Sequence, residues 1–264
     1  MNVLIVCVNY NSYKELQSFI KSIDESLYDV SDIQVDVIIA DNSSKYQEYE
    51  YTPQNELLSV EHRKSDNNGY LGTAQRIINT IDDIRQYDYV AISNVDIVVS
   101  NNFFRVLSQI ELDDNIGWVV TAIKSELIGR DKNPSVLKRY SKRKLRFLKL
   151  TYNSIVLPLY EKLYYQKKTG AMEYGETDIY AGHGSFMMLT KAFFQRNKDL
   201  NYPMFLYGEE LYLAELNRKS NLRVRYIPSL VINDFEHVST SQLRRSSYYE
   251  YNRNAIDYIL KVFY

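Results

Sequence analysis

Short apolar runs alternate with amphipathic stretches along the first hundred residues of the chain. The runs at 2–10, 34–44 and 87–99 have the length and composition of buried strands, and the last is expected to be one continuous strand. Over 13–27, apolar residues recur at the spacing of an amphipathic helix. A glycine-bearing loop leads into a second helix within 67–84. This order predicts an α/β fold with a mostly parallel sheet and helices on its faces.

Polar side chains cluster where the three predicted strands end, at 9–12, 41–44 and 94–96. Because ligands bind at the carboxyl ends of parallel strands, three clusters at corresponding positions indicate a nucleotide site at one edge of the sheet. The alternative is that they are ordinary turns, since turns favour asparagine, aspartate and serine. In the last cluster, Asn94 and Asp96 interrupt an otherwise apolar run.

A basic segment separates the two halves of the chain. Residues 130–170 carry 12 lysines and arginines against 2 acids. Over 137–150, leucine and tyrosine interleave with these bases, which predicts a basic amphipathic helix that could bind an anionic membrane surface. The alternative is a solvated helix that packs one stripe on the body. Nucleic acid is not an expected partner, because no recognised binding motif accompanies the charge.

Composition narrows the cellular setting. The 264 residues are 45% hydrophobic, enough for a full core, and 32 basic residues nearly cancel 33 acidic ones. The single cysteine, Cys7, can form no intrachain disulfide, which fits a reducing compartment. The first residues are too short an apolar run for a signal peptide, and no window reaches the roughly 18 apolar residues of a membrane span. We therefore expect a cytoplasmic protein.

Several short motifs occur in a telling order: VNYNS (8–12), ADNSS (40–44), NNGYLGTAQ (67–75), SNVD (93–96), GHGSFMMLTKAFF (182–194), FLYGEELYL (205–213), YIPS (226–229) and EHVSTS (236–241). Their order and spacing resemble the inverting GT-A glycosyltransferases of the rhamnosyltransferase-like kind, glycosyltransferase family 2 type. The resemblance implies a Rossmann-like GT-A domain with a basic helical insertion and a C-terminal helix. It divides that domain into a nucleotide-sugar half (1–129), the insertion (130–170) and an acceptor-binding, catalytic half (171–264).

The resemblance implies a metal-assisted departure of a nucleoside diphosphate. The Asn-x-Asp motif at 94–96 matches the family's metal motif, so Asp96 would bind Mn²⁺ or Mg²⁺, which prefer oxygen ligands. His237 stands where the family often adds a ligand. Asn94 would instead orient the donor sugar or ribose.

The resemblance also implies a general base that takes the proton of the acceptor hydroxyl. Glu209 and Glu210 stand at the family's acidic pair, with Glu210 as the expected base and Glu209 orienting it or contacting the acceptor. The chain departs from the pattern twice, because aspartate is common at position 210 and Tyr212 replaces another acid. An exposed acidic helix start is the alternative explanation of the pair.

Donor recognition is assigned by the resemblance to the first half and to one histidine. A UDP- or dTDP-sugar would contact residues at the strand ends and in the glycine loop, together with His183: Asn9, Asn11, Asp41, Asn67, Gly69, Asn94 and Asp96. Gly69 and Gly72 are expected to let the backbone approach the nucleotide. Gln75 departs from the family's usual asparagine. His62 is expected in a middle loop.

Three functions compete at this point. The first is a metal-dependent inverting glycosyltransferase whose acceptor is lipid-linked and presented at the inner face of the cell membrane, as in surface polysaccharide biosynthesis. The second is a non-catalytic nucleotide or glycan binder on the same fold, which the departures from the motifs favour. The third is a sugar nucleotidyltransferase, which would need a glycine-rich, basic loop after the first strand, where this chain has neither.

Overall fold

One large sheet organises the molecule, and the computed structural model describes residues 1–125, 129–165, 174–235 and 244–264. The strands are β1 (Asn2–Asn9), β2 (Gln34–Asp41), β3 (Leu58–Lys64), β4 (Tyr89–Asn94), β5 (Ile97–Val99), β6 (Ile116–Ser125), β7 (Arg130–Asp131), β8 (Thr177–Ile179), β9 (Phe186–Thr190) and β10 (Arg223–Asp234). The helices are α1 (Tyr13–Glu25), α2 (Tyr70–Ile78), α3 (Phe103–Ser108), α4 (Lys142–Thr151), α5 (Val156–Tyr165), α6 (Lys191–Arg196), α7 (Glu209–Lys219) and α8 (Arg245–Phe263), with a 3₁₀ turn η1 (Ile84–Gln86).

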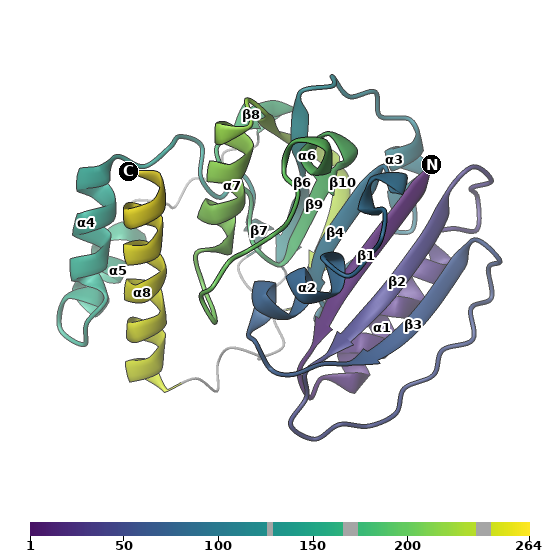
Figure 1. Cartoon of the computed structure of the whole chain (residues 1–264), viewed down its shortest axis with the longest axis horizontal. Coiled ribbons are helices and arrows are strands. Elements are labelled where there is room, and N and C mark those ends of the chain that lie inside the picture. Colours follow the sequence, from purple (N-terminus) through teal and green to yellow (C-terminus); the bar gives the residue numbers. More distant parts are fainter. Residues whose placement is uncertain (126–128, 166–173, 236–243) are drawn as a thin grey trace.

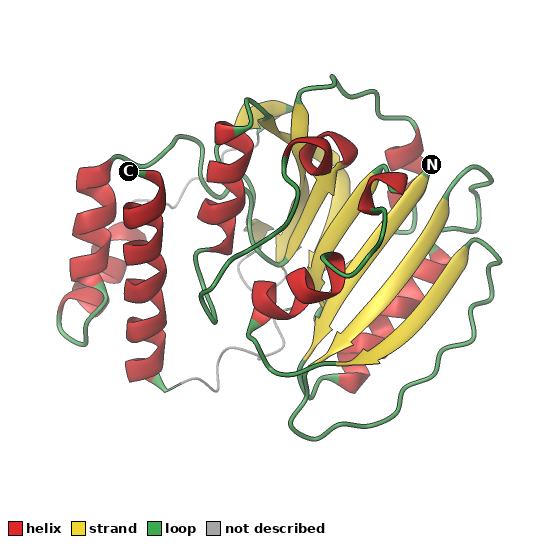
Figure 2. Ribbon diagram, in the orientation of Figure 1, coloured by secondary structure: helices red, strands yellow, loops and turns green. Residues whose placement is uncertain are grey.

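The strand order is β3-β2-β1-β4-β9-β6-β10-β5, with β7 beside β6 and β8 beside β10. Strands β1 to β4 are mutually parallel, as are β6 and β10, whereas β9 runs antiparallel between β4 and β6. Helices lie on both faces of this sheet (Figures 1 and 2). The predicted α/β fold with a mostly parallel sheet flanked by helices is confirmed.

The strands at the centre of the sheet are buried on both faces. In β1, alternate residues enter two different cores: Val3, Ile5 and Cys7 join the core with α1 and α3, while Leu4 and Val6 join the core with α2 and α7. Figure 1 shows α1 behind the sheet and α2 in front of it. Burial on both sides explains why this strand reads as a continuous apolar run rather than an alternating one. Burial also raises the pKa of the Cys7 thiol, so this cysteine is inert packing.

The predicted continuous strand at 87–99 is wrong. The chain leaves the sheet after Asn94, bends at Val95 and Asp96, and re-enters it as β5, which pairs antiparallel with β10 at the far edge. The sequence does not indicate this break, because β4 and β5 are both buried and both are therefore apolar. An apolar run predicts that a segment is buried, but not where the chain changes direction. The bend carries Asp96 out of the sheet.

The predicted helix over 137–150 begins later than expected. Helix α4 starts at Lys142, where the Ser141 hydroxyl caps it by accepting a hydrogen bond from the Lys144 backbone N–H. Helix α4 packs antiparallel to α8. The Lys142 ammonium at the start of α4 donates to the Tyr264 carbonyl at 3.0 Å, and Lys149 near the end of α4 pairs with Asp257 at 2.7 Å. Among the residues described, no helix is long and apolar enough to cross a bilayer.

Candidate active site

The polar ends of β1, β2 and β4 meet at one edge of the sheet. Asn9 lies opposite Asp41, and Val8 lies opposite Asn94 in the pairing register. Asn9 donates to the Ser43 hydroxyl at 3.3 Å, and the same hydroxyl accepts the Asn11 backbone N–H at 2.7 Å. The structure therefore brings Asn9, Asn11 and Asp41 together with Asn94, as parallel strands require.

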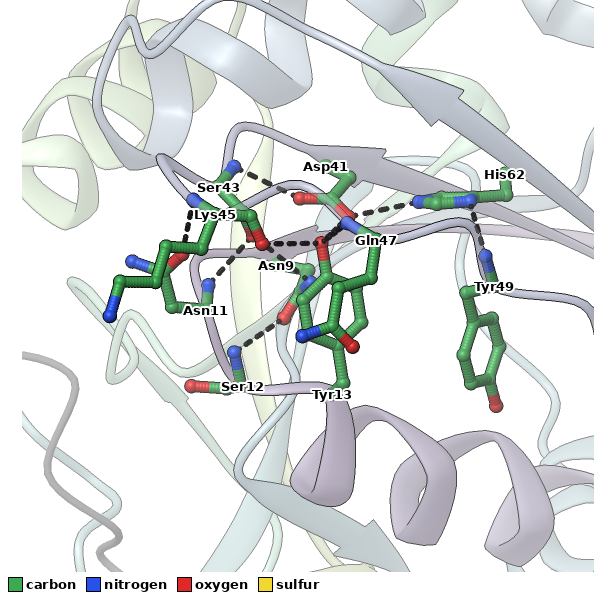
Figure 3. A network of polar contacts seen from close by, with 10 residues as sticks. All are labelled: Asn9, Asn11, Ser12, Tyr13, Asp41, Ser43, Lys45, Gln47, Tyr49 and His62. Atoms are coloured by element: carbon green, nitrogen blue, oxygen red, sulfur yellow. Dashed lines mark hydrogen bonds and ion pairs between the residues drawn. The ribbon is translucent and has the colours of Figure 1, made fainter.

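Asp41 is fully buried at the centre of a hydrogen-bond network (Figure 3). Its Oδ1 accepts the Ser43 backbone N–H at 2.9 Å. Its Oδ2 accepts the Tyr13 hydroxyl at 2.8 Å and lies 2.9 Å from His62 Nε2. Burial raises the pKa of this carboxyl, but the hydrogen bonds from Ser43, His62 and Tyr13 outweigh it and hold the pKa below its usual value. Both oxygens of Asp41 thus have partners within the protein.

His62 lies on β3 and not in a loop, contrary to the expectation from sequence. Its Nδ1 accepts the Tyr49 backbone N–H at 3.2 Å, and a backbone N–H can only donate. The ring proton therefore sits on Nε2, where a neutral imidazole donates it to Asp41. The Tyr46 ring stacks on His62 with centroids 5.4 Å apart. In the sequence, the available signal for this contact is a histidine beside a short apolar run.

Asn67 and Gly69 lie in a loop held by the Asn42 side chain. The Asn42 amide donates to Asn67 Oδ1 and to the Gly69 carbonyl, each at 3.3 Å. Gly69 has a φ of 78°, and an added Cβ would lie 1.5 Å from the Phe205 carbonyl oxygen. The close approach of the Phe205 backbone therefore requires glycine at this position.

Gln75, the departure from the family's asparagine, has a packing role. Its amide donates to the Tyr202 carbonyl at 2.9 Å and accepts the Tyr202 backbone N–H at 2.7 Å. The side chain thereby ties α2 to the segment that leads into α7. A glutamine makes both bonds to the backbone of one residue in another element, and this accounts for its presence.

Asp96 lines a pocket of about 380 Å³ between the bend after β4 and helix α1. Lys14, Glu15 and Ser18 of α1 line the same pocket. Burial, and then the charge of Asp234, raise the pKa of Asp96 to about 6. Asp96 therefore sits in a half-buried place with excess negative charge, where a cation would be stabilised.

Asp234 is a site residue that the sequence analysis missed. It ends β10, pairs in register with Ile97, and forms an ion pair with Lys132 at 2.9 Å. The Ser185 hydroxyl lies 3.4 Å from the same carboxylate. The available signal was weak: an acid at the end of an apolar strand, three residues before His237.

His183 belongs to this neighbourhood. Its Nδ1 accepts the Ser185 backbone N–H at 3.2 Å and lies 2.9 Å from the Ser185 hydroxyl. The Ser185 carbonyl in turn accepts the Asn94 backbone N–H at 2.9 Å. Ser185 thus connects His183, Asn94 and Asp234, so the structure brings these three close together.

Glu209 and Glu210 open helix α7, directly after Gly208, which has a φ of 81°. Glu210 presses its carboxylate on Gly184, where an added Cβ would lie 2.6 Å from Oε1. Burial raises the pKa of both carboxyls, and the charge of Glu210 further raises that of Glu209, to about 8. Oε2 of Glu209 is buried without a hydrogen-bond partner in the described part of the chain. The expected alternative, an exposed acidic helix start, does not describe this pair.

Tyr212, which replaces a family acid, is a core residue. Its ring is buried and packs on Tyr202 with centroids 4.8 Å apart, and its hydroxyl accepts the Asn201 backbone N–H at 3.0 Å. No third carboxylate is presented from this position.

Tyr70 connects the two groups of acids and was also missed from sequence. Its hydroxyl donates to the Gly184 carbonyl at 2.9 Å. Burial raises the pKa of this phenol well above its usual value, and the charges of Glu209, Glu210 and Asp96 raise it further. The two acids of α7 and the acid of the bend therefore lie within electrostatic reach of one side chain.

The oxygen atoms near Asp96 are of the type that binds a hard divalent cation, but among the described residues they are too few to form a complete metal site. Across the described ranges, no three histidine, cysteine or acidic side chains gather closely enough to hold a metal ion. Asp96 and Asp234 supply carboxylate oxygens, the ligand type that Mg²⁺ and Mn²⁺ prefer, and the raised pKa of Asp96 marks negative charge that a cation would offset. His237, the other expected ligand, lies outside the described residues.

Comparison with known proteins bears on the fold. No family model and no curated protein matches the chain. Among solved structures, S. aureus TarS 1–349 in complex with UDP-GlcNAc superposes with a TM-score of 0.56 at 12% identity, over 92% of this chain and 62% of that one. The mannosyltransferase PcManGT from Pyrobaculum calidifontis, in complex with GDP-Man and Mn²⁺, gives 0.50 at 13%, over 90% and 58%. The chain has a GT-A-like glycosyltransferase fold. It spans about 60% of the length of these structures, and at such identities the likeness concerns the fold and not the rhamnosyltransferase kind.

Proposed function

We propose that this chain is an inverting glycosyltransferase that moves a sugar from a nucleotide-sugar donor to a glycan acceptor. The observation that carries the proposal is the pair of acids at the start of α7, with Glu209 buried and Glu210 held against Gly184, in a chain with a glycosyltransferase fold. Support also comes from the complexes of similar structures with UDP-GlcNAc and GDP-Man. Neighbouring carboxylates such as Glu209 and Glu210 are costly to bury without a chemical use.

The donor would lie along the carboxyl edge of the sheet. Asn9 and Asn11 would face the nucleoside, and the loop with Asn67 and Gly69 would border it. Because both oxygens of Asp41 already have partners, Asp41 would act on the nucleoside mainly by fixing the loop that begins at Ser43. Asn94 and His183, joined through Ser185, would orient the sugar or ribose. A UDP- or dTDP-sugar is the proposed donor class.

Glu210 would be the general base, and Glu209 would orient it or contact the acceptor. The Glu210 carboxylate takes the proton of the acceptor hydroxyl as that oxygen forms its bond to the anomeric carbon from the face opposite the diphosphate. The bond from the anomeric carbon to the diphosphate oxygen breaks, and its electron pair leaves with the nucleoside diphosphate. A carboxyl whose pKa is raised by burial is better matched to this proton transfer near neutral pH than an exposed one.

Mn²⁺ or Mg²⁺ would be held by Asp96, with His237 as the further proposed ligand and Asp234 adjacent. When bound, such an ion neutralises negative charge on the departing diphosphate. Lys132 pairs with Asp234 and keeps a cationic group beside this position in any case. Mn²⁺ in one similar structure supports the proposal.

The finer assignments rest on the sequence resemblance. We propose a rhamnosyltransferase-like enzyme of surface polysaccharide biosynthesis, with a lipid-linked acceptor at the inner, cytoplasmic face of the cell membrane. The division into a donor half (1–129), a basic insertion (130–170) and an acceptor half (171–264) belongs to the same proposal. The packing of α4 against α8 supports a proposed insertion that rests on the proposed acceptor half.

Nucleotide binding and turnover test the proposal in two steps. Thermal unfolding is measured with UDP, dTDP and GDP and their sugars, each with and without Mn²⁺, because a ligand that binds only the folded state raises the melting temperature. Hydrolysis or transfer of the stabilising donor is then followed in the wild type, Asp96→Asn and Glu210→Gln. Stabilisation with turnover that both variants lose is the expected result. Stabilisation without turnover in the wild type would instead favour the non-catalytic binder, and no stabilisation by any nucleotide would refute both.

A further inference from the structure

The α4–α5 hairpin carries a cluster of exposed apolar side chains. They lie at the end of α4, in the turn after it and at the start of α5, and they are between 39% and 75% exposed: Phe147, Leu150, Ile155, Val156 and Leu159. We call this cluster the hairpin tip. Five large apolar side chains are thus exposed within 13 residues of one helical hairpin, whereas apolar side chains exposed singly are ordinary on proteins.

The hairpin tip is the outer surface of a packed element. Leu145 is buried and Leu148 half-buried on the side of α4 that meets α8. Arg143, Arg146, Phe147 and Leu150 follow the i, i+3, i+4, i+7 spacing of the opposite face. The Phe147 ring contacts Tyr160 of α5 with centroids 6.1 Å apart, so both helices contribute to one surface. Figure 1 shows α4, α5 and α8 together at the end of the molecule away from β3.

Only part of the basic charge predicted from sequence is available at this surface. Lys142 bonds the Tyr264 carbonyl, Lys149 pairs with Asp257, and the Lys144 ammonium lies over the Tyr140 ring. Arg143 and Arg146 are exposed and form no ion pair or hydrogen bond with the described residues. Helix α4 contains no acid. Two unpaired arginines therefore border an apolar surface.

We propose that the hairpin tip docks on an anionic lipid bilayer, with its apolar side chains at the acyl boundary and Arg143 and Arg146 at the lipid phosphates. This is the charge and apolar pattern of a helix that lies in the membrane interface. Arginine suits the role because its planar guanidinium binds phosphate oxygens in pairs. The proposed membrane surface differs from the 137–150 segment predicted from sequence. It begins later in the chain, at Arg143, and continues past residue 150 into α5.

A second copy of the chain fits this surface less well. A two-fold interface places the same patch of both subunits in contact, so it would gather Arg143 and Arg146 of both copies at one interface, with no acid on α4 to offset them. Repulsion between like charges disfavours that arrangement. A lipid surface supplies the phosphates that these arginines lack within the chain.

A chain of tyrosine contacts leads from the hairpin towards helix α7, and its use rests on the proposed function. Tyr152, which follows the last residue of α4, packs edge-on against Tyr248 of α8, and Tyr248 packs against Tyr207. Tyr207 lies two residues before Glu209, at the start of α7. The acceptor proposed to be lipid-linked is the class of substrate that a docked bilayer presents.

Vesicle sedimentation of the full chain tests the docking. Wild type is compared with Arg143→Gln/Arg146→Gln and with Leu150→Ser/Ile155→Ser, on phosphatidylglycerol–phosphatidylcholine and on pure phosphatidylcholine vesicles. Each basic residue near an anionic surface contributes about fivefold to partitioning, so we expect roughly 30-fold weaker binding for the arginine pair. The apolar pair should weaken binding more than about tenfold. Arg76→Gln/Arg105→Gln and Tyr28→Ser, exposed residues on other elements, are the matched controls and should bind as wild type.

Three results would overturn the proposal: equal sedimentation of tip variants and controls, equal binding to neutral and anionic vesicles, or a dimer in solution that the Leu150→Ser/Ile155→Ser variant loses. The nucleotide-dependent thermal shift is measured on the same samples. A tip variant that loses vesicle binding and keeps this shift supports docking at a surface separate from the donor site. Absence of the shift in the wild type would refute the proposed function and leave the vesicle result standing.

Discussion

His62 Nε2 lies 2.9 Å from Asp41 Oδ2, and this contact joins β3 to β2 beneath the candidate donor site. Because His62 Nδ1 accepts the Tyr49 backbone N–H, Nε2 is the ring nitrogen that donates to Asp41. The Asp41 carboxylate also accepts hydrogen bonds from the Ser43 backbone N–H and the Tyr13 hydroxyl. The Tyr13 hydroxyl in turn accepts the Gln47 backbone N–H at 2.7 Å. One buried carboxylate thus organises the loop from Ser43 to Tyr49 that borders the site.

Replacing His62 should destabilise the protein through Asp41. His62→Ala removes a donor from a buried carboxylate and should lower the free energy of unfolding by about 1–3 kcal/mol. His62→Gln, which offers an N–H of its own, should recover part of this loss. Tyr28→Phe is the matched control, because it removes an exposed hydrogen bond to Gln54 and should change stability little. Urea denaturation near neutral pH measures all three, and an unchanged His62→Ala would contradict the role given to this network.

The lowered pKa of Asp41 also predicts a dependence on acid. The pKa of the Asp41 carboxyl is lower in the folded protein than in the unfolded chain, where it is about 4. The ionised carboxylate therefore stabilises the folded protein at pH values above about 4, and this stability is lost as the pH falls through the folded pKa. The difference in unfolding free energy between wild type and Asp41→Asn should therefore shrink as pH falls below about 4. Denaturation at a series of pH values checks this, and a constant difference would show that the charge of Asp41 is not what stabilises the loop.

The sequence predicted elements better than it predicted bends and distant contacts. The helix expected over 13–27 is Tyr13–Glu25, because a periodic apolar stripe is a local property. The bend at Asp96 escaped because both flanking strands are buried. The helix expected over 137–150 begins only at Lys142, because the apolar stripe does not mark the Ser141 hydroxyl that caps its first turn.

The same limit applies to the candidate site. The polar strand ends were found because each stands at the end of its own apolar run. Tyr70 and Lys132 were missed because their partners are remote: Tyr70 and Gly184 are 114 residues apart, and Lys132 and Asp234 are 102 apart. Only the fold brings such pairs together. His237 remains a prediction, since it lies outside the described residues.

Glu209 should make stability fall with rising pH. Its folded pKa, about 8, lies above the ordinary value of 4.5, so between these values the folded state keeps a proton that the unfolded state has released. Stability from this group is present below about pH 4.5 and is lost as pH rises towards 8. Glu209→Gln, which cannot ionise, should therefore be more stable than wild type at pH 8, by on the order of 2 kcal/mol.

Glu215 on the same helix is the matched control. It is also buried, but Arg139, Tyr180 and Arg218 bind its carboxylate, and its pKa is lowered. Glu215→Gln should thus destabilise the protein at neutral pH, the opposite sign. Thermal unfolding of both variants at pH 5 and pH 8 decides the matter, and destabilisation by Glu209→Gln at pH 8 would show that Glu209 has an ionic partner.

Gly184→Ala should reduce turnover more than stability. The new methyl would lie 2.6 Å from Glu210 Oε1, and because a glutamate side chain can move, the carboxylate should shift rather than the backbone. A displacement of about 1 Å in a catalytic group can cost about a hundredfold in rate, so kcat should fall by that order while the nucleotide thermal shift persists. Gly175→Ala, where an added Cβ meets nothing within 4 Å, is the control and should match wild type. A Gly184→Ala variant with full kcat would argue against Glu210 as the base.

Asp96 and Asn94 should fail in different ways, although they are two residues apart in one motif. Asp96 faces the pocket with excess negative charge, so Asp96→Ala should abolish the part of the nucleotide thermal shift that depends on Mn²⁺. Asn94 belongs to the end of β4 and bonds Ser185 through its backbone, so Asn94→Ala should keep the Mn²⁺ dependence and weaken the response to the nucleotide sugar more than to the free nucleotide.

The control for both variants is Asp82→Ala, which replaces an exposed acid on another loop and should change neither response. Equal loss of the Mn²⁺ response in Asp96→Ala and Asn94→Ala would assign both residues to one role. Because the bend after Asn94 turns Asp96 out of the sheet towards α1, the separation of roles is the outcome that this backbone predicts.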